Sequence, residues 1–361
     1  MTETVDAPVL TPPTCLWIPP GRKGSYGDEV AEIAEAIRRP LDPEQLLTVD
    51  ALTSFGQQGR WMSIEQGVEM PRQNGKTGGI LLPIVLARVL LFDPDLFLWT
   101  AHMLDTSSKA LNDFLRLIEE CSWLSRRVKT ISAENGNEGI TFTNGSQLDF
   151  RARSARRGRG LSGGGLVVDE ALFWTGDQAG AVLPVLATRS VTGNPWVLYA
   201  SSAARAESDY LRTLRARARS GRDMSLTWVG WWARGSWLDP GCAAGECSHG
   251  LHESGCALDS EELWAEANPT LGRRISTEFL RSMRRTMPPL EFGREFLGWQ
   301  QGGDEAIDLE RWSGLVDPLS VPEKRPVALA IDVSPGLRSA AVVAVGQIGR
   351  ASCRERVSSP V

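Results

Sequence analysis

The stretch that decides the fold is Met70-Pro71-Arg72-Gln73-Asn74-Gly75-Lys76-Thr77. A strand-like run, 65–70, enters it and a long apolar run, 80–92, leaves it. A tight loop between a strand and a helix can cradle phosphate groups, because backbone N–H groups of the loop and of the helix N-terminus point at the ligand. In such a loop the Lys76 ammonium reaches the β and γ oxygens and the Thr77 hydroxyl is placed to bind Mg²⁺. Methionine stands where the first glycine of the motif is usual, so an ATP site needs support from the rest of the chain.

The composition is that of an ordinary globular protein. The chain has 361 residues, of which 42% are hydrophobic and 23% are charged, so it is long enough for one large domain or two. The formal net charge of −5 gives no general attraction for nucleic acid, and any such partner has to bind through local charge. No apolar run is long enough to span a membrane and no signal peptide is recognisable, so we expect a cytoplasmic protein with no membrane partner.

Apolar strands and amphipathic helices alternate along most of the chain. Buried strands are expected at 95–99, 166–168, 196–200 and 225–229, and helices at 28–38, 42–52, 80–92 and 106–121. Asn144-Gly145, between two runs of alternating polarity, predicts a β-hairpin. This order predicts an α/β fold, with a mostly parallel sheet flanked by helices on both faces.

The run Leu166-Val167-Val168-Asp169-Glu170 is the strongest support for an ATP site. Three apolar residues followed by two acids fit a buried strand that delivers both carboxylates to the ligand-binding edge of the sheet. There Asp169 would hold Mg²⁺ and Glu170 would polarise the attacking water. A strand that simply ends in two solvated acids is the alternative, which the preceding phosphate loop disfavours.

Three further groups of polar residues lie near these strands. Five arginines precede the acidic strand, at Arg151, Arg153, Arg156, Arg157 and Arg159. They form either a solvated basic loop or a functional one, in which an arginine contacts the γ-phosphate and the others contact DNA phosphates. Ser201 and Ser202 end another buried strand, where small hydroxyl residues can sense the γ-phosphate, although an ordinary strand end has the same appearance. Arg212, Arg215 and Arg219 share one face of the next expected helix, which is either solvated or a DNA track.

Cys242, Cys247, His249, His252 and Cys256 offer five soft metal ligands within a short loop. Zinc takes four such ligands in a tetrahedron, but these spacings match no common zinc finger. The loop therefore either binds a structural Zn²⁺ or is a reduced, metal-free loop.

Asp332 ends the apolar run 327–331, as the first metal-binding carboxylate of a two-metal nuclease does. Such chemistry needs further carboxylates, and only Glu355 lies downstream. We therefore expect no complete nuclease centre in this chain.

With these motifs in this order, residues 28–346 resemble the large terminase subunit of tailed bacteriophages, the motor that packages DNA into procapsids. Residues 71–77 resemble that family's phosphate loop, in which an Arg-Gln pair stands before Gly-Lys, so Met70 is an expected departure. By this resemblance, Gln45 corresponds to an adenine-contacting glutamine and Arg159 to an arginine finger that acts in trans within a ring. Ser201-Ser202-Ala203 resembles the coupling motif, 291–298 the helix that links motor and nuclease, and 328–334 the first strand of the RNase H-like nuclease.

The resemblance implies a RecA-like P-loop ATPase that uses ATP and Mg²⁺ to translocate double-stranded DNA. Gln45 and residues 72–77 would bind ATP, Thr77 and Asp169 the Mg²⁺, with Glu170 as base and Arg72 or Arg159 stabilising the transferred charge. The implied partners are double-stranded DNA, other copies of the chain in a homo-oligomeric ring, the portal protein and the small terminase subunit. The implied location is the host bacterial cytoplasm, at the procapsid portal.

The resemblance also suggests how the chain is divided. We expect an irregular N-terminal arm (1–27), a P-loop ATPase core (28–240), a linker subdomain with the Cys/His-rich loop (241–303), a linker with the truncated start of the nuclease domain (304–346) and a tail (347–361). The tail does not resemble the family, so we expect it to be foreign to the native reading frame and disordered.

Two other functions fit the same residues. The first is a helicase-type P-loop ATPase, which would separate DNA strands. The second is a non-catalytic protein that binds DNA or a capsid and carries a decayed nucleotide site, which would not bind Mg-ATP.

Overall fold

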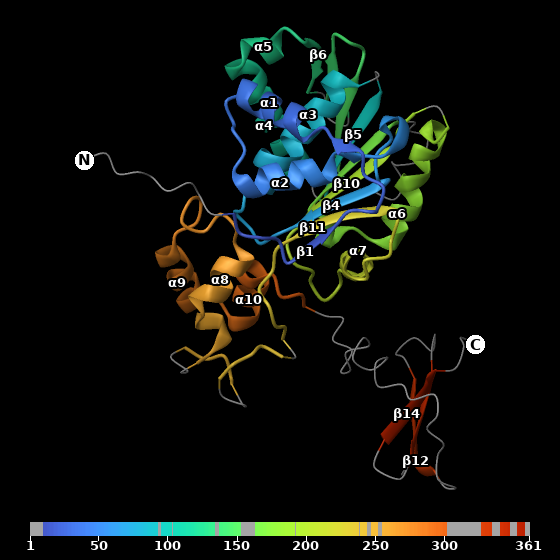
Figure 1. Ribbon diagram of the computed structural model, residues 1–361, viewed down its shortest axis with the longest axis vertical. Coiled ribbons are helices and arrows are strands. Elements are labelled where there is room, and N and C mark those ends of the chain that lie inside the picture. The colour runs from blue at the N-terminus through green and yellow to red at the C-terminus, as the bar shows by residue number, and fades with distance from the viewer. Residues whose placement is uncertain are drawn as a thin grey trace. The chain divides into compact units, whose positions relative to one another are not determined.

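Figure 1 shows a computed structural model of the chain, which divides into two compact units, Met1–Gly303 and Asp304–Val361. The residues it describes are 10–92, 95–102, 104–133, 137–152, 163–191, 193–237, 239–243, 247–251, 255–301, 326–333, 340–346 and 352–357.

The first unit contains both strands and helices. In chain order they are β1 (Cys15–Trp17), β2 (Gly24–Ser25), α1 (Gly27–Ala36), α2 (Pro43–Leu52), β3 (Ser54–Phe55), β4 (Glu65–Glu69), a π-helical turn (Thr77–Leu81), α3 (Leu82–Leu91), β5 (Leu96–Ala101), α4 (Leu104–Glu120), α5 (Ser122–Ser125), β6 (Val128–Ser132), β7 (Gly139–Phe142), β8 (Gln147–Ala152), β9 (Gly165–Asp169), α6 (Gly176–Val182), β10 (Trp196–Ser201), α7 (Asp209–Arg219), β11 (Leu226–Gly230), α8 (Glu261–Ala267), α9 (Thr277–Thr286) and α10 (Pro289–Leu297). Short 3₁₀ turns lie at Gln57–Gly59, Ala171–Phe173, Leu183–Arg189 and Ala257–Asp259.

A nine-stranded sheet forms the centre of this unit, in the order β1-β11-β4-β10-β9-β5-β8-β7-β6. The strands from β11 to β8 are parallel to one another. β1 is antiparallel at one edge, and β7 and β6 continue antiparallel from β8 at the other. Helices α1 to α5 cover one face and α6 and α7 the other (Figure 1). This arrangement confirms the predicted α/β fold.

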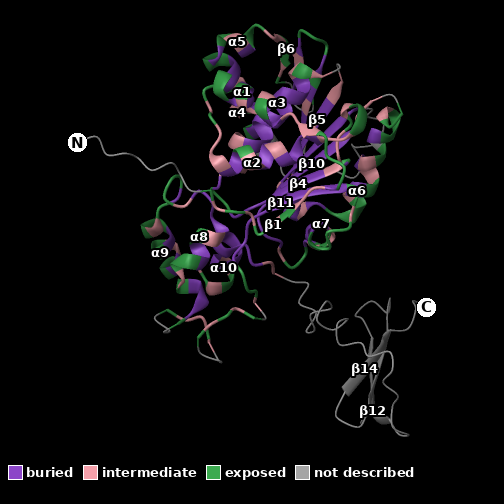
Figure 2. Ribbon diagram, in the orientation of Figure 1, coloured by how far each residue is buried: buried purple, intermediate pink, exposed green. Residues whose placement is uncertain are grey.

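Each face of the sheet packs into its own hydrophobic core. Along β9, Val167 belongs to the core under α1 to α5, whereas Leu166 and Val168 belong to the core under α6 and α7. Successive residues of a strand point to opposite faces, so a strand covered on both sides is apolar throughout. The central strands are accordingly buried along their whole length (Figure 2).

The N-terminal arm is more regular than we expected. Cys15–Trp17 forms the edge strand β1, which pairs with β11, and the Trp17 indole donates to the carbonyl of Asp223 at 2.7 Å. The composition of 1–27 suggested an irregular arm because prolines surround this segment, but prolines are tolerated beside a short edge strand.

A third hydrophobic core lies in the region 233–299 and contains residues of α8, α9 and α10. Ser260 and Ser276 cap α8 and α9, each accepting from the backbone N–H three residues on. Gly298 ends α10 with a left-handed φ of 69°, a conformation that glycine adopts without strain. The linker subdomain that we expected at 241–303 thus shares its core with residues from 233 on, and from here on the name refers to residues 233–301.

The second unit contains a three-stranded antiparallel sheet of β12 (Pro326–Val333), β13 (Ala340–Gly346) and β14 (Ser352–Val357). β14 lies in the tail for which we expected disorder, and its residues pair with β13. The physical reason is that β13 would otherwise present an unpaired edge, with which any extended segment can form backbone hydrogen bonds.

Among the helices that the structure describes, none is both long and apolar enough to cross a lipid bilayer.

Candidate functional site

The predicted site residues meet where three neighbouring parallel strands end. β4 leads into the 70–77 loop, β9 ends at Asp169 and β10 ends at Ser201, and β10 lies between the other two strands. Because parallel strands end at the same sheet edge, their following residues converge there. They line a cavity of about 420 Å³, which also includes Glu170 and Ser202. The sequence had predicted each of these three groups separately.

The 70–77 loop turns sharply to face this cavity. Gln73 and Gly75 have left-handed φ angles of 66° and 80°, which is uncommon for a residue other than glycine. The Lys76 ammonium donates to the carbonyl oxygens of Met70, at 2.6 Å, and Pro71, at 2.9 Å. The helix after the loop starts at Thr77 as a π-helical turn, three residues earlier than expected.

Burial lowers the pKa of Lys76 to about 8, although the Asp169 carboxylate opposes the shift. The Arg72 guanidinium lowers this pKa further by charge repulsion. A bound phosphate would stabilise the charged form of Lys76 and thereby raise its pKa. Phosphate binding would therefore relieve the cost of burying this ammonium group.

Thr77 and Asp169 provide the oxygens that Mg²⁺ prefers. The Thr77 hydroxyl lies 3.4 Å from Asp169 Oδ2, and both line the cavity. A hydroxyl and a carboxylate side by side at the end of a phosphate loop fit a Mg²⁺ that also binds nucleotide phosphates. Glu170 follows with a left-handed φ of 54°, and its backbone N–H donates to Asp169 Oδ1 at 2.9 Å.

Arg72 lines the same cavity but is also paired with the linker subdomain. Its Nε lies 3.1 Å from Oε2 of Glu295, a buried residue of α10. The Arg72 side chain is 52% exposed, so it can move without unpacking a core. The 70–77 loop is thereby in contact with the helix that we expected to link the motor to the nuclease.

Asn74 ties the loop to the linker subdomain more firmly. Its side chain is 1% exposed and its amide donates to Asn268 Oδ1 at 3.0 Å. Its Oδ1 accepts from the Thr270 hydroxyl at 2.8 Å. The Asn74 side chain does not line the cavity. The expected contact of Asn74 with ATP therefore stays a prediction.

Gln45 also lies against the loop rather than in the cavity. It is buried in α2, where it forms a capping box with Asp42, and its Nε2 lies 3.5 Å from the carbonyl oxygen of Gly75. A Cβ on Gly79 would lie only 2.1 Å from this Nε2, so the glycine is what lets Gln45 approach. Adenine contact by Gln45 stays a prediction.

Glu69 and Arg215 form a buried pair that the sequence did not reveal. Arg215 Nη1 lies 3.2 Å from Glu69 Oε1 and donates to the Gly298 carbonyl at 3.1 Å. Burial raises the pKa of Glu69, and Arg215 and Gln300 oppose this shift. The expectation that Arg215 lies on a solvated face or a DNA track is wrong, because its guanidinium stacks 3.5 Å over the ring of Trp232.

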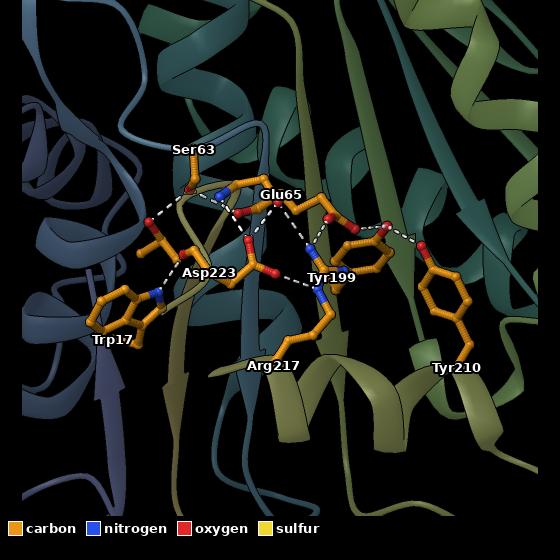
Figure 3. Close-up of polar contacts among 9 residues, drawn as sticks. Trp17, Ser63, Glu65, Tyr199, Tyr210, Arg217 and Asp223 are labelled. Carbon is orange, nitrogen blue, oxygen red and sulfur yellow. Dashed lines mark hydrogen bonds and ion pairs between the residues drawn. The ribbon is translucent and has the colours of Figure 1, made fainter. Parts of the chain in front are cut away.

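A second polar cluster lies at the opposite sheet edge, where β4 begins (Figure 3). Arg217 pairs with both Glu65, at 2.5 Å, and Asp223, at 2.6 Å, and Tyr199 donates to Glu65 at 3.1 Å. The hydrogen bond from Arg217 lowers the pKa of Asp223 to about 2. This cluster joins β4, β10 and α7 and lies at the end of β4 opposite to the 70–77 loop.

Four residues of the Cys/His-rich loop come together. The ligand atoms of Cys242, Cys247, His249 and Cys256 all lie within 4.8 Å of one another. The fifth candidate, His252, lies outside the described residues.

The other predicted residues are placed only in part. Arg159 and its neighbours from 153 to 162 lie outside the described residues, so the predicted arginine finger stays a prediction. Asp332 lies on β12, where its backbone pairs with Ala341 of β13.

A second cavity, of about 500 Å³, adjoins the loop on the side of the linker subdomain. Gln73 lines both cavities, and the second is otherwise lined by residues 272–276 and by Phe279. The Phe279 ring is 43% exposed. No sequence motif had indicated this cavity.

Comparison with known proteins gives one line of support at the level of the fold. No protein-family model and no curated protein sequence matches the chain. The crystal structure of the bacteriophage HK97 large terminase is similar with a TM-score of 0.62 and 17% identity, over 92% of this chain and 67% of that one. The large terminase of the thermophilic bacteriophage D6E has a TM-score of 0.48 and 12% identity, over 85% of this chain and 65% of that one. The large terminase ATPase domain of Thermus phage P74-26 has a TM-score of 0.48 and 16% identity, over 74% of this chain and 97% of that one.

The HK97 likeness has a TM-score above 0.5 and covers nearly all of this chain. Because the two chains are only 17% identical, this similarity shows a shared fold and does not show the chemistry of the site. The chain therefore has the RecA-like fold of the bacteriophage large terminase.

Proposed function

We propose that this chain is the ATP-hydrolysing part of a phage DNA-packaging motor. The observation that carries the proposal is the convergence of the 70–77 loop, Asp169-Glu170 and Ser201-Ser202 on one cavity. The three groups occur at the ends of neighbouring parallel strands, which is where open α/β sheets bind ligands. The terminase-like fold agrees with this role but does not carry it.

Each group has a distinct part in the proposed hydrolysis. Lys76 exchanges its two backbone carbonyl partners for phosphate oxygens, and Thr77 and Asp169 hold the Mg²⁺, which would neutralise phosphate charge. Glu170 orients the attacking water and accepts its proton. Arg72 stabilises the charge on the transferred phosphoryl group, with Arg159 of a neighbouring subunit as the alternative source.

We further propose that the nucleotide base enters the second cavity, in place of the adenine contact that we expected at Gln45, which does not line this cavity. Gln73 lines both cavities, so they are adjacent, and we place the base in the second when the phosphates are in the first. Phe279 offers an exposed ring on which a base can stack, and Arg274 lies close to Gly75, at the boundary. Phe279→Ala should therefore weaken ATP binding and leave inorganic tripolyphosphate binding unchanged, as measured by calorimetry. Equal losses for both ligands would place the base elsewhere.

Ser201 and Ser202 couple the cavity to the rest of the unit in this proposal. The carbonyl oxygen of Ser201 accepts from the backbone N–H of Met70 at 3.1 Å, so the two strand ends move together. Double-stranded DNA, a homo-oligomeric ring, the portal protein and the small terminase subunit remain the proposed partners, and the host bacterial cytoplasm the proposed location.

Stimulation of ATP hydrolysis by duplex DNA tests this function against its rivals. We expect the full chain to hydrolyse ATP faster with linear duplex DNA than without it, and to release no single strand from a forked duplex. Strand release would favour the helicase-type ATPase. Failure to bind Mg-ATP would favour a non-catalytic protein with a decayed site.

A further inference from the structure

The Cys/His cluster has the dimensions of a closed metal site. The His249 Nδ1 atom lies 3.7 Å from the Cys242 sulfur and 3.6 Å from the Cys256 sulfur. In a tetrahedral zinc site, with Zn–S of about 2.3 Å and Zn–N of about 2.0–2.1 Å, sulfur and nitrogen ligands are about 3.6 Å apart. These two pairs therefore already have the spacing that one tetrahedral ion requires, and Cys247 lies within 4.8 Å of the other three ligand atoms.

The backbone around the cluster is arranged for thiolate ligands. The backbone N–H of Ala257 donates to Cys242 Sγ at 3.2 Å, and a sulfur accepts such a bond better when it is charged. His249 has a left-handed φ of 56°, a costly conformation for a residue with a side chain. This local cost is explained if the turn has to bring the imidazole to the three sulfurs.

Arg284 supports the site from α9. The side chain is buried, and its Nη2 donates to the carbonyl oxygens of His249, at 2.9 Å, and Gly250, at 3.1 Å. The same nitrogen lies 3.9 Å from Cys256 Sγ, and Asp259 pairs with the guanidinium on its other side. Three thiolates and a histidine around a divalent ion carry one net negative charge, and the Arg284 guanidinium lies between this charge and that of Asp259.

We propose that Cys242, Cys247, His249 and Cys256 bind one structural Zn²⁺, with Arg284 as a positioning residue. Four protein ligands leave no open position, so the ion is structural and not catalytic. Its role is to close the loop 242–256 onto the third core, which contains Cys256 and the partly buried Cys242 and Cys247. The described part of this loop has no helix or strand of its own to hold it.

Metal content of the full chain, purified without chelators, tests the proposal directly. We expect about one zinc per chain by plasma mass spectrometry, released stoichiometrically when a mercurial reagent titrates the thiols. Cys242→Ser and Cys256→Ser should each lose the metal. Cys15→Ser alters a cysteine outside the cluster and should keep it. Zinc that is equally present in all three variants, or absent from the wild-type chain after zinc is added, would overturn the proposal.

Cobalt substitution gives a readout that does not depend on whether a variant folds. In the wild-type chain, Co²⁺ should give the intense visible bands of a tetrahedral site together with thiolate charge transfer. An octahedral spectrum without thiolate bands, or a disulfide among these cysteines in the freshly purified chain, would contradict the assignment.

Arg284→Ala should weaken zinc affinity by about 10–100-fold, the usual effect of losing an outer-shell partner. Arg285→Ala, one residue further along α9, is its matched control, and an equal loss in both would remove Arg284 from its role.

Discussion

The positive charge of Lys76 is energetically unfavourable because the side chain is buried in the 70–77 loop. Its pKa of about 8, lowered by burial, lies well below the usual value for a lysine. Nucleotide phosphates would stabilise the ammonium and raise this pKa. At a pH where the lysine of the free protein is neutral, binding is therefore accompanied by the uptake of a proton. Under the proposed function, the charge of this residue sets the pH range in which ATP binds well.

The first prediction concerns the pH dependence of ATP affinity, because Lys76 has to be protonated to bind phosphate well. ATP affinity should be retained below pH 8 and should fall above it, approaching about tenfold per pH unit, as measured by fluorescent-nucleotide titration. Lys76→Arg is the control, because a guanidinium stays charged throughout this range. A wild-type profile as flat as that of the arginine variant would show that Lys76 does not bind phosphate.

Asn74 is a second residue whose side chain holds the 70–77 loop in its conformation. Asn74→Ala removes the bonds to Asn268 and Thr270 and leaves their polar groups buried without these partners. We expect a loss of about 1–3 kcal/mol in the free energy of unfolding by urea titration, and weaker ATP binding. Gln73→Ala, next to it but exposed, should leave stability unchanged. Unaltered stability of the Asn74 variant would mean that the loop is not held by the linker subdomain.

At the scale of elements, α2 packs closely against the π-helical turn Thr77–Leu81 because residue 79 is a glycine. Gly79→Ala would place a methyl group 2.1 Å from Gln45 Nε2 and 2.5 Å from its Cδ. Gln45 is buried and caps α2, so it cannot move away freely. We expect a loss of about 1–3 kcal/mol in the free energy of unfolding, the range for overpacked sites.

Two further variants check this packing. Gly78→Ala should be tolerated, because the nearest atom to its added Cβ is the end of the Arg39 side chain, at 3.5 Å. The double variant Gly79→Ala/Gln45→Ala should lose less stability than the sum of the two single losses, since the clash is removed. Additive losses in the double variant would show that the two residues do not meet.

Some elements could be predicted from the sequence because their signals are local. Asp42, Pro43 and Gln45 form the predicted start of α2, and Asn144-Gly145 joins β7 to β8 as expected. The edge strand β1 has no such signal, because its three residues depend on the exposed edge of β11. Arg215 was misread for a similar reason. Its helical spacing is that of a surface arginine, and only the distant Glu69 and Trp232 make it a buried one.

At the scale of the first unit, the cavity could be predicted but not the subdomain that contacts it. Parallel strands bring their ends together by geometry alone, so Lys76, Asp169 and Ser201 could be placed at one edge. The contact between Asn74 and Asn268 joins residues 194 positions apart through two short amides, and no periodic pattern encodes such a pair. The linker subdomain thus holds the nucleotide loop through contacts that only the folded chain reveals.

The measurement that most directly tests ATP hydrolysis at this cavity is turnover by the Glu170→Gln variant. The substitution keeps the shape of the side chain but removes its ability to accept a proton from water. We predict that duplex-stimulated ATP hydrolysis falls by at least about 100-fold, the usual contribution of a general base, while binding of a fluorescent ATP analogue stays within about twofold of wild type. Turnover equal to that of the wild-type chain would contradict the proposed mechanism.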